Sequence, residues 1–339
     1  MNSSSQPVVL LSHGGGGLRT RELLRDVILP AIRNPILDRL DDAACLSVPE
    51  QDLAVTTDSY VIHPLFFPGG DIGRLAVCGT VNDLAMQGAE PRYLSLGLIL
   101  EEGLEISALR RVMESVGGTA RAVGLRVVTG DTKVVERGRG DGLFINTSGI
   151  GARRAGVDTH VSNARPGDAV LLTGTMGDHG VAVMSAREGL RFQTDLRSDV
   201  APLWDLVRVL LDAAPGVRCL RDPTRGGVAA ALNDIAEASR VCVRITESSL
   251  PVRDEVRGAC ELLGLDPLNV ANEGKAIVVC DPAAADRALA ALRAHPLGRE
   301  AARIGAIAAD PPGRVLLATR LGGARLVDVP SGEDLPRIC

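Results

Sequence analysis

The sequence predicts a two-domain α/β (α+β) protein, and three observations support this fold class. The chain has 339 residues, more than twice a usual domain of about 150. Hydrophobic residues make up 45% and charged residues 23%, a balance typical of globular proteins with a substantial core. Apolar runs of strand length also alternate with helical patterns. We therefore expect an N-terminal domain over residues 1–155, a C-terminal α+β domain over 156–328 and a tail over 329–339.

The N-terminal domain shows strand-like and helix-like segments in turn. Runs rich in apolar and β-branched residues predict strands, and apolar residues spaced by three and four predict helices. The expected strands are Leu53–Thr57, Tyr93–Leu100, Leu125–Thr129 and Leu143–Ser148, and the expected helices are Ile72–Gln87 and Ile106–Val123.

The C-terminal domain opens at a Pro-Gly turn, Arg165–Asp168. The expected strands are Ala169–Thr173, Val241–Ile245, Ala276–Cys280 and Val315–Ala318, and the expected helices are Val181–Arg187, Val200–Ala213 and Gly227–Ser239. One short step, Asn-Asp-aliphatic-Ala, occurs in a helix of each domain, at Asn82–Ala85 and Asn233–Ala236. This repetition hints that the two halves are related.

The tail differs from both domains. Pro330, Gly332 and Pro336 oppose a continuous helix. Fully extended, the segment from Pro330 to the last residue, Cys339, could reach roughly 30 Å. We expect a mobile tail that carries a thiol to a site on the body of the protein.

Composition and charge argue against several classes of protein. The net charge is −5, whereas nucleic-acid binding is driven by an excess of Lys and Arg. Phe, Trp and Tyr total 2% of the chain, which leaves few residues for base stacking or for aromatic belts at a membrane. The N-terminus lacks the charged and apolar regions of a secretory signal. We expect a cytoplasmic protein with no nucleic-acid or membrane partner.

The seven cysteines show no CxxC pair and no His partner at zinc spacing, so neither a zinc site nor a disulfide framework is indicated. Six of them lie in or beside predicted helices and strands, and we expect them to pack as small hydrophobic side chains. Cys339 has no such context. An accessible thiol is an oxidation liability, so we expect Cys339 to be used.

Acidic residues recur in short contexts of small residues: Asp41-Asp42, Thr57-Asp58, Asn82-Asp83 and Gly130-Asp131. One such Asp is most often a turn or cap residue. Four in one domain favour a shared site, because hard oxygen ligands suit Mg²⁺ bound to nucleotide phosphates. Gly79, one turn before Asp83, leaves room for a ligand to approach the helix.

Two glycine-rich segments could contact phosphate. Ser12–Gly17 could do so through successive backbone N–H groups, although it lacks the Gly-Lys-Ser/Thr of a P-loop. Asp222-Pro223 precedes the helix predicted at 227–239 and has the chemistry of an N-cap and first helical residue. Arg225, with two following glycines, would add an anion site there. Lys133 and Glu273 are candidates for proton transfer if burial or a charged neighbour shifts their pKa.

Together these motifs resemble the HypE family of hydrogenase maturation factors, in the superfamily of aminoimidazole ribonucleotide synthetase, selenophosphate synthetase and thiamine-monophosphate kinase. The matching stretches are Ser12–Gly17, Asp41–Ala44, Thr57–Ser59, Pro64–Gly73, Gly79–Ala85, Gly130–Val134, Asp222–Gly227, Asn272–Gly274 and Pro336–Cys339. The resemblance implies a PurM-like fold in which two N-terminal domains pair into a dimeric β-barrel. It also implies ATP and Mg²⁺ as cofactors.

The resemblance implies a reaction and roles for individual residues. A partner carbamoyltransferase would load Cys339, ATP would drive dehydration of the S-carboxamide to a thiocyanate, and further maturation proteins would accept the cyanide. Catalysis falls to Cys339, Glu273 and Lys133. Nucleotide contacts fall to Gly14, Gly15, Gly16, Gly17, Asp58, Asn82, Asp83, Asp131, Thr132, Asp222, Arg225 and Asn272. Metal contacts fall to Asp42, Asp58, Asp83 and Asp131.

Two other functions stay open. The chain could be another ATP-dependent enzyme of this superfamily, a kinase or synthetase of a small free substrate, although such an enzyme would have no use for a terminal thiol. It could also be a non-enzymatic thiol carrier whose partner contacts are gated by ATP.

Overall fold

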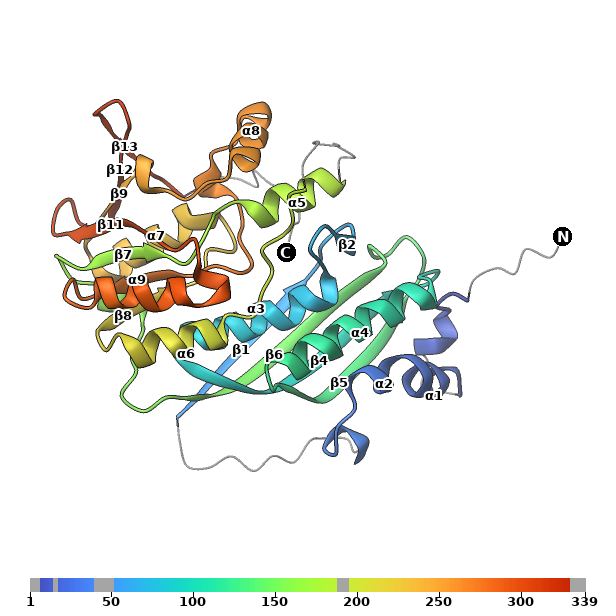
Figure 1. The fold of residues 1–339 in the computed structure, drawn as a ribbon. Coiled ribbons are helices and arrows are strands. Elements are labelled where there is room, and N and C mark those ends of the chain that lie inside the picture. Colours follow the sequence, from blue (N-terminus) through green and yellow to red (C-terminus); the bar gives the residue numbers. More distant parts are fainter. Residues whose placement is uncertain (1–6, 15–17, 40–51, 188–194, 330–339) are drawn as a thin grey trace.

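The computed structural model describes residues 7–14, 18–39, 52–187 and 195–329. Within them the chain forms two larger sheets, one in each half (Figure 1). Gly14 ends a short 3-10 helix, whereas Gly15, Gly16, Gly17, Asp42 and Cys339 lie outside the described residues, as does Cys45. No helix of the described segments is long and apolar enough to cross a bilayer.

The first sheet has the strand order β1-β6-β4-β5 in the described residues. Its strands are β1 (Leu53–Tyr60), β4 (Ala89–Glu101), β5 (Arg126–Val135) and β6 (Leu143–Arg153). β4 and β5 run parallel because α4 (Ile106–Ala122) connects them, whereas β6 is antiparallel to both of its neighbours. The edges of this sheet are therefore β1 and β5.

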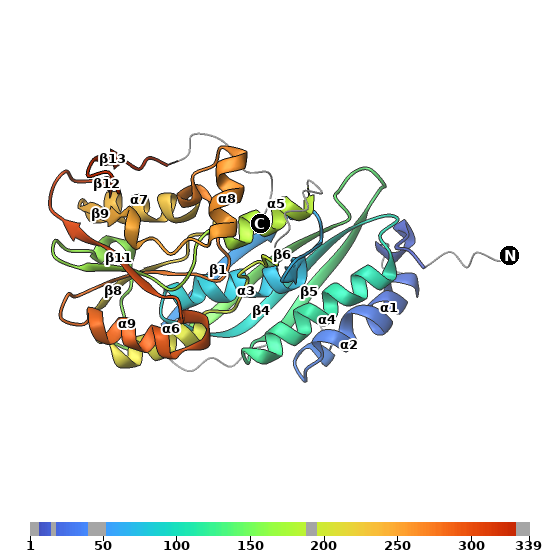
Figure 2. The same cartoon turned by 45° about the horizontal axis from the view of Figure 1, so that its top comes forward.

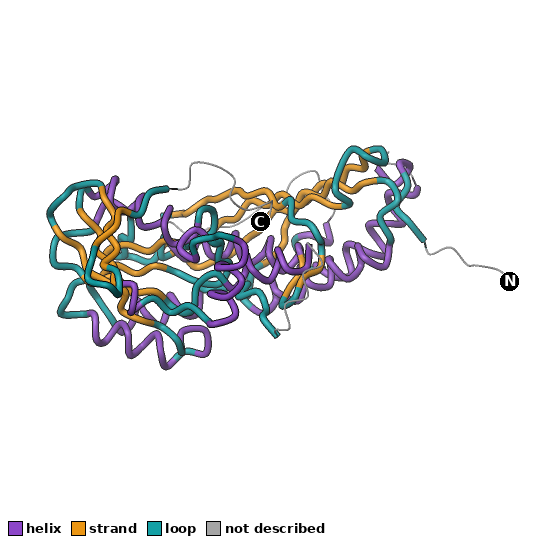
Figure 3. Tube along the Cα trace, turned by 90° about the horizontal axis from the view of Figure 1, so that it is seen from above, coloured by secondary structure: helices purple, strands orange, loops and turns teal. Residues whose placement is uncertain are grey.

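Helices cover one face of this sheet, and the strands lie along the opposite side of the domain (Figures 2 and 3). The covering helices are α3 (Ile72–Met86) and α4. α3 begins at Asp71, whose side chain accepts the N–H groups of Gly73 and Arg74. A small hairpin, β2 (Phe66–Phe67) and β3 (Gly70–Asp71), precedes it.

A chain of short helices not expected from the sequence lies beside α4. It comprises η1 (Leu11–Gly14), α1 (Leu18–Leu23), the π-helical η2 (Leu24–Ile28), α2 (Leu29–Ile32) and η3 (Leu37–Arg39). Gly117 on α4 allows the close approach, because a Cβ there would lie 1.8 Å from the carbonyl oxygen of Ala31. The Arg121 side chain donates to the same carbonyl.

The second sheet has the order β13-β12-β9-β11-β7-β10-β8 among the described residues. Its strands are β7 (Ala169–Leu172), β8 (Val217–Arg221), β9 (Cys242–Thr246), β10 (Ile277–Cys280), β11 (Ala302–Ala308), β12 (Arg314–Ala318) and β13 (Ala324–Leu326). α7 (Gly227–Ser239) packs on one face, and α6 (Trp204–Ala213) and α9 (Ala285–Ala294) pack on the other. Burial on both faces explains why its central strands are continuous apolar runs.

The remaining elements connect these layers. α5 (Asp178–Arg187) and α8 (Asp254–Leu263) belong to the same core as the N-terminal sheet, so the two halves share a continuous interior. The short helices are η4 (Val161–Asn163), η5 (Glu247–Ser249), η6 (Pro267–Asn269) and η7 (Pro296–Gly298).

Each strand and helix predicted from the sequence is present, with one clear correction. The helix expected from Val200 begins instead at Trp204. Pro202 disfavours helical backbone at Ala201. The Leu203 N–H and the Ala201 carbonyl also bond the Asn82 side chain. Strands β2, β3, β8, β11 and β13 and helices α8 and α9 were not predicted from the sequence.

The repeated Asn-Asp step has the same structural role in both halves. Asn82 on α3 and Asn233 on α7 are buried, and each side-chain amide bonds backbone groups of distant segments. Asn82 reaches Ala201 and Glu273, and Asn233 reaches Val327. In each half the Asn therefore joins its helix to a neighbouring segment.

Candidate active site

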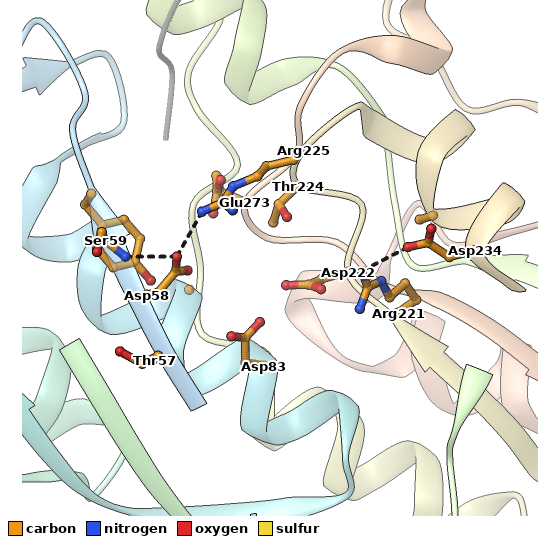
Figure 4. Close-up of a pocket in the computed structure, with 13 residues that line it drawn as sticks. Thr57, Asp58, Ser59, Asp83, Arg221, Asp222, Thr224, Arg225, Asp234 and Glu273 are labelled. Atoms are coloured by element: carbon orange, nitrogen blue, oxygen red, sulfur yellow. Dashed lines mark hydrogen bonds and ion pairs between the residues drawn. The ribbon is translucent and has the colours of Figure 1, made fainter. Parts of the chain in front are cut away.

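A cavity of about 270 Å³ opens at the β1 edge of the N-terminal sheet, where the two halves of the chain meet. Acidic side chains from four separate segments converge on it (Figure 4). Its lining residues are Thr57, Asp58, Ser59, Tyr60, Gly79, Asp83, Arg221, Asp222, Thr224, Arg225, Ala231, Asp234 and Glu273. The cavity therefore brings together five of the site residues predicted from the sequence, Asp58, Asp83, Asp222, Arg225 and Glu273.

Arginines balance only some of these carboxylates. Arg225 contacts Asp58 at 3.0 Å, and Arg221 contacts Asp234 at 2.9 Å. Asp83 accepts a hydrogen bond from the Thr56 hydroxyl at 2.6 Å. Because the Arg225 side chain is 73% exposed, it lies at the mouth of the cavity, where an anionic ligand would meet it.

Burial and mutual repulsion favour the protonated form of the inner carboxyls. Glu273 is 3% exposed, and desolvation together with Asp222 and Asp199 raises its pKa well above the ordinary value. Desolvation and the neighbouring Asp83 raise the pKa of Asp222 to about 7. The pKa of Asp83 is raised mainly by desolvation. Perturbed carboxyls in a cleft are the usual environment of catalytic and cation-binding groups.

The cavity fits a divalent cation in charge and chemistry. Asp58, Asp83, Asp222 and Glu273 offer hard oxygen ligands, and a cation would relieve the repulsion between them. No three acidic, His or Cys side chains of the described segments already stand close enough together to form a coordination sphere. Asp58 and Asp83 are thus the predicted metal ligands that face this cavity.

A second cavity, of about 250 Å³, lies at the opposite edge of the same sheet. Its wall is aliphatic and its rim polar. It is lined by Thr20, Leu24, Ile28, Leu29, Ile32, Leu37, Leu96, Leu98, Thr129, Gly130, Asp131, Thr132 and Lys133. Lys133 contacts Asp131 at 3.3 Å, and these side chains are 66% and 68% exposed. Within one chain, Asp131, Thr132 and Lys133 therefore do not join the cavity that holds Glu273.

Asn82 and Asn272, both predicted to contact nucleotide, hydrogen-bond backbone groups through their side chains in the described structure. Asn272 accepts the Gly177 N–H at 2.7 Å and donates to the Pro223 carbonyl at 3.1 Å. Asn82 is 1% exposed and bonds three backbone groups of the C-terminal half. Their assignment to nucleotide contact stays a prediction.

One local interpretation of the sequence needs correction, and another is incomplete. Asp222 does not cap α7, because that helix begins at Gly227 after Gly226, whose φ of +69° turns the chain into it; the Asp222 carboxylate faces the cavity instead. Gly79 lines the cavity, but its missing side chain also accommodates a neighbouring residue of the protein. A Cβ there would lie 2.3 Å from the Tyr60 hydroxyl oxygen, so the glycine makes room for Tyr60.

Several residues that line the cavity were not predicted from the sequence. For one of them, Asp234, a sequence pattern was available. Asp234 occupies in α7 the position that Asp83 occupies in α3, as the repeated Asn-Asp step implied. Tyr60 and Arg221 lie in no predicted motif, whereas Thr224 lies within the Asp222–Gly227 motif but was not singled out. A third cavity of about 670 Å³ continues from the first, with Asp83, Arg221 and Asp222 in both linings.

The cysteines of the described segments pack as expected. Cys78, Cys219, Cys242, Cys260 and Cys280 are all buried. Burial raises the pKa of Cys78 to about 12 and that of Cys260 to about 11, which suppresses the reactive thiolate.

Comparison with known proteins agrees with this architecture. Residues 40–152 match the family model of the AIR synthase related protein N-terminal domain, and residues 165–317 match that of the C-terminal domain. The chain is 53% identical over 331 residues to "Carbamoyl dehydratase HypE" of Azotobacter vinelandii, covering 98% of this chain and 97% of that protein. It is 49% identical over 336 residues to that of Escherichia coli K12, covering 98% and 99%.

Two solved structures extend the comparison. A hydrogenase maturation protein HypE in complex with ATP superposes with a TM-score of 0.94 at 49% identity, covering 97% of this chain and 99% of that one. A HypE–HypF complex gives a TM-score of 0.80 at 45% identity, covering 93% and 100%. The two-domain fold and these full-length similarities show that the chain belongs to the HypE family of carbamoyl dehydratases.

Proposed function

We propose that this protein uses ATP to dehydrate a carbamoyl group carried on its own Cys339, and so supplies the cyanide ligand of a [NiFe]-hydrogenase iron. The observation that carries the proposal is Glu273, a carboxyl held 3% exposed in a cavity lined by other acids. In its ionised form such a group is a stronger base than an ordinary carboxylate, because burial raises its pKa, and the formation of a C≡N bond requires a base. The ATP complex of a relative supports the use of ATP.

The reaction balances as a phosphoryl-assisted dehydration. The carboxamide oxygen attacks the γ-phosphoryl of ATP and releases ADP, and the phosphorylated oxygen then leaves as inorganic phosphate. The two N–H protons are lost as the C≡N bond forms. Glu273 accepts a proton, and Lys133 stabilises developing charge or relays a proton. Mg²⁺ would neutralise charge on the phosphates, held by Asp58 and Asp83 with Asp42 and Asp131.

A homodimer would complete the site. The first cavity lies at the β1 edge and the second, with Asp131 and Lys133, at the β5 edge. These two edges leave backbone groups available for pairing with another chain. The surface at β1 carries exposed apolar side chains: Val55 is 70% exposed and Leu53 is 44% exposed. Pairing β1 of one copy with β5 of another would form the barrel and bring the two half-sites together.

The partners follow from the chemistry. A carbamoyltransferase must load Cys339, and the HypE–HypF complex of relatives supports such a contact. Further maturation proteins would accept the cyanide. All of these steps would take place in the cytoplasm, where thiols stay reduced.

Intact mass spectrometry tests the proposal. The protein is loaded with the carbamoyltransferase and its donor, then incubated with Mg-ATP or with a non-hydrolysable analogue. We expect an adduct on Cys339 that loses one water only with ATP. Cys339→Ala should abolish loading, whereas Cys260→Ala, at a buried thiol of α8, should load normally. An adduct on another residue would contradict the proposal.

Glu273→Gln tests the base. This variant should load normally but stall before dehydration, and normal water loss would remove Glu273 from the role. Water loss with the analogue would favour the thiol carrier. Phosphorylation of thiamine monophosphate at an undiminished rate in Cys339→Ala would favour a small-molecule kinase.

A further inference from the structure

The backbone of Glu273 is held from two sides by buried side chains that lie far from it in the sequence. Its N–H donates to Asp199 Oδ1 at 3.0 Å. Its carbonyl oxygen accepts from Asn82 Nδ2 at 3.1 Å. Both peptide groups that flank the Glu273 Cα are therefore fixed by side-chain hydrogen bonds.

Asn82 is itself immobilised. It lies on α3 of the N-terminal half, is 1% exposed, and its Oδ1 accepts the Leu203 N–H at 2.8 Å. Its Nδ2 also donates to the Ala201 carbonyl at 3.1 Å. Rotation of this amide would break all three hydrogen bonds, so α3 fixes the position of the Glu273 carbonyl.

Asp199 is fixed by a buried cation. Lys275 Nζ lies 3.1 Å from its second oxygen, and the two side chains are only 11% and 3% exposed. The Lys275 stem packs over Gly174, where a Cβ would lie 2.9 Å from Cε. A buried carboxylate is stable only with such a partner. Lys275 thus keeps Asp199 ionised and in place as an acceptor.

The same segments are in contact through Gly274. A Cβ at this position would lie 1.9 Å from the Asp199 carbonyl oxygen, so the chain after Glu273 lies directly against the chain at Asp199. The loop 272–275 thus has no space to shift toward Asp199.

We propose that Asn82 and Asp199 are positioning residues for Glu273, with Lys275 supporting Asp199. Asn82 fixes the carboxyl relative to α3, the helix that also carries Asp83 into the cavity, and Asp199 fixes it from the C-terminal half. This inference rests on the proposed role of Glu273 as the base. Its value for catalysis is geometric, since a misplacement of about 1 Å can cost roughly 100-fold in rate.

The test is the single-turnover rate of water loss from the carbamoylated homodimer, followed by intact mass, beside ATP affinity and carbamoyl loading. Asp199→Ala should slow dehydration about 100-fold, and Asp199→Asn, which keeps an acceptor oxygen, should restore the rate to within about 10-fold of wild type. Loading and the Kd for ATP should change by less than about threefold. Equal rates in the Ala and Asn variants would overturn the assignment of Asp199.

Asn82→Ala tests the other contact, with Asn233→Ala as the matched control. Asn233 is the buried Asn of the repeated step and bonds Ala229 and Val327, away from Glu273. Both variants should lower the melting temperature, but only Asn82→Ala should slow dehydration, by about 10- to 100-fold. Equal slowing in both would show a general loss of structure and overturn the proposal. The Asn82 and Asp199 contacts to Glu273 are independent of each other. If one of the two alanine variants does not fold, the dehydration rate of the other still tests the proposal.

The Glu273→Gln variant distinguishes a failure of the proposed base role of Glu273 from a failure of the proposed positioning role of Asn82 and Asp199. If it dehydrates normally, the base role fails, whatever Asn82 and Asp199 do. If it stalls while Asp199→Ala and Asn82→Ala proceed at the wild-type rate, the base role stands and the positioning role alone is wrong.

Discussion

The two edges of the N-terminal sheet carry the same kind of acidic motif in opposite surroundings. At the β1 edge, Asp83 and Glu273 face a cavity closed by the C-terminal half, and desolvation raises the pKa of both. At the β5 edge, Asp131 is 68% exposed and contacts Lys133, beside an aliphatic cavity. The local sequence does not distinguish them. What the carboxyl can do depends on whether another part of the chain covers it.

The edges are therefore complementary. The β1 edge concentrates negative charge that attracts a cation and holds a proton near neutral pH, whereas the β5 edge offers an apolar wall with a polar rim. One chain presents each half on a different side of the sheet, and only a second copy would bring a β5 edge to a β1 edge. If burial makes the difference, substitutions at the β1 edge should change the stability of the protein much more than substitutions at the exposed β5 edge.

The largest effect should come from Asp222, whose pKa is raised to about 7 in the folded protein from 3.8. The folded state binds this proton more tightly than the unfolded state, so this carboxyl destabilises the fold as the pH rises from about 4 to about 7. The upper limit is about 4 kcal/mol, which contact with water reduces because Asp222 is only partly buried. In ligand-free protein, Asp222→Asn should be more stable than wild type at pH 8. The gap should narrow toward pH 5 in urea titrations; a gap independent of pH would contradict this.

Gly274→Ala should come next, because its Cβ would strike the backbone carbonyl of Asp199 and displace Glu273. We expect a loss of about 3 kcal/mol in the free energy of unfolding and a much slower dehydration. Gly258→Ala is the matched control, since Gly258 lies on α8 with nothing within 4 Å of a new Cβ, and it should gain about 0.5–1 kcal/mol. Chemical denaturation measures both, and equal stabilities would refute the steric argument.

Gly79→Ala should cost about 2 kcal/mol, because the new methyl would meet the Tyr60 hydroxyl. Tyr60→Phe removes that oxygen, whose contact with Thr80 Oγ1 is long at 3.5 Å, and should itself cost little. The double variant should recover at least half of the lost stability. A double-mutant cycle with no coupling would show that Tyr60 is not what Gly79 accommodates.

The smallest effect on stability should come from the β5 edge. Asp131→Asn and Lys133→Ala remove an exposed ion pair and should each change the free energy of unfolding by less than about 0.5 kcal/mol. The rate of dehydration should nevertheless fall in the Lys133→Ala variant if the β5 edge completes the active site of a second copy. Mixed dimers of Lys133→Ala and Glu273→Gln chains test whether the two edges share a site. One of their two sites would be intact, so the dehydration rate should return to about half that of the wild-type dimer.

Because apolar periodicity and turn residues act locally, the sequence was enough to predict the two-domain fold class and most of the longer helices and strands. It also placed Asp58, Asp83, Asp222 and Glu273 in motifs, whereas Asp234 was not predicted, although it lies in the repeated Asn-Asp step. It did not predict β8, α8 and α9, whose patterns are short and whose stability comes from tertiary packing: β8 and α9 in the core of the C-terminal sheet, and α8 in the core shared with the N-terminal sheet. Local chemistry also suggested a cap at Asp222, which is wrong, and gave no sign that Gly79 makes room for Tyr60, since both features depend on residues distant in the sequence.

Only the tertiary structure decided which polar residues share a cavity and which hold the fold. Glu273 and Lys133 are equally plausible proton carriers in the sequence, yet one is 3% exposed among acids and the other contacts Asp131 on the surface. Nothing in the local sequence of Asn82 indicates that its side chain hydrogen-bonds three backbone groups of the C-terminal half. The physical reason is that pKa values and side-chain roles follow from desolvation and from neighbours brought together over long sequence separations. A motif records only the neighbours along the chain.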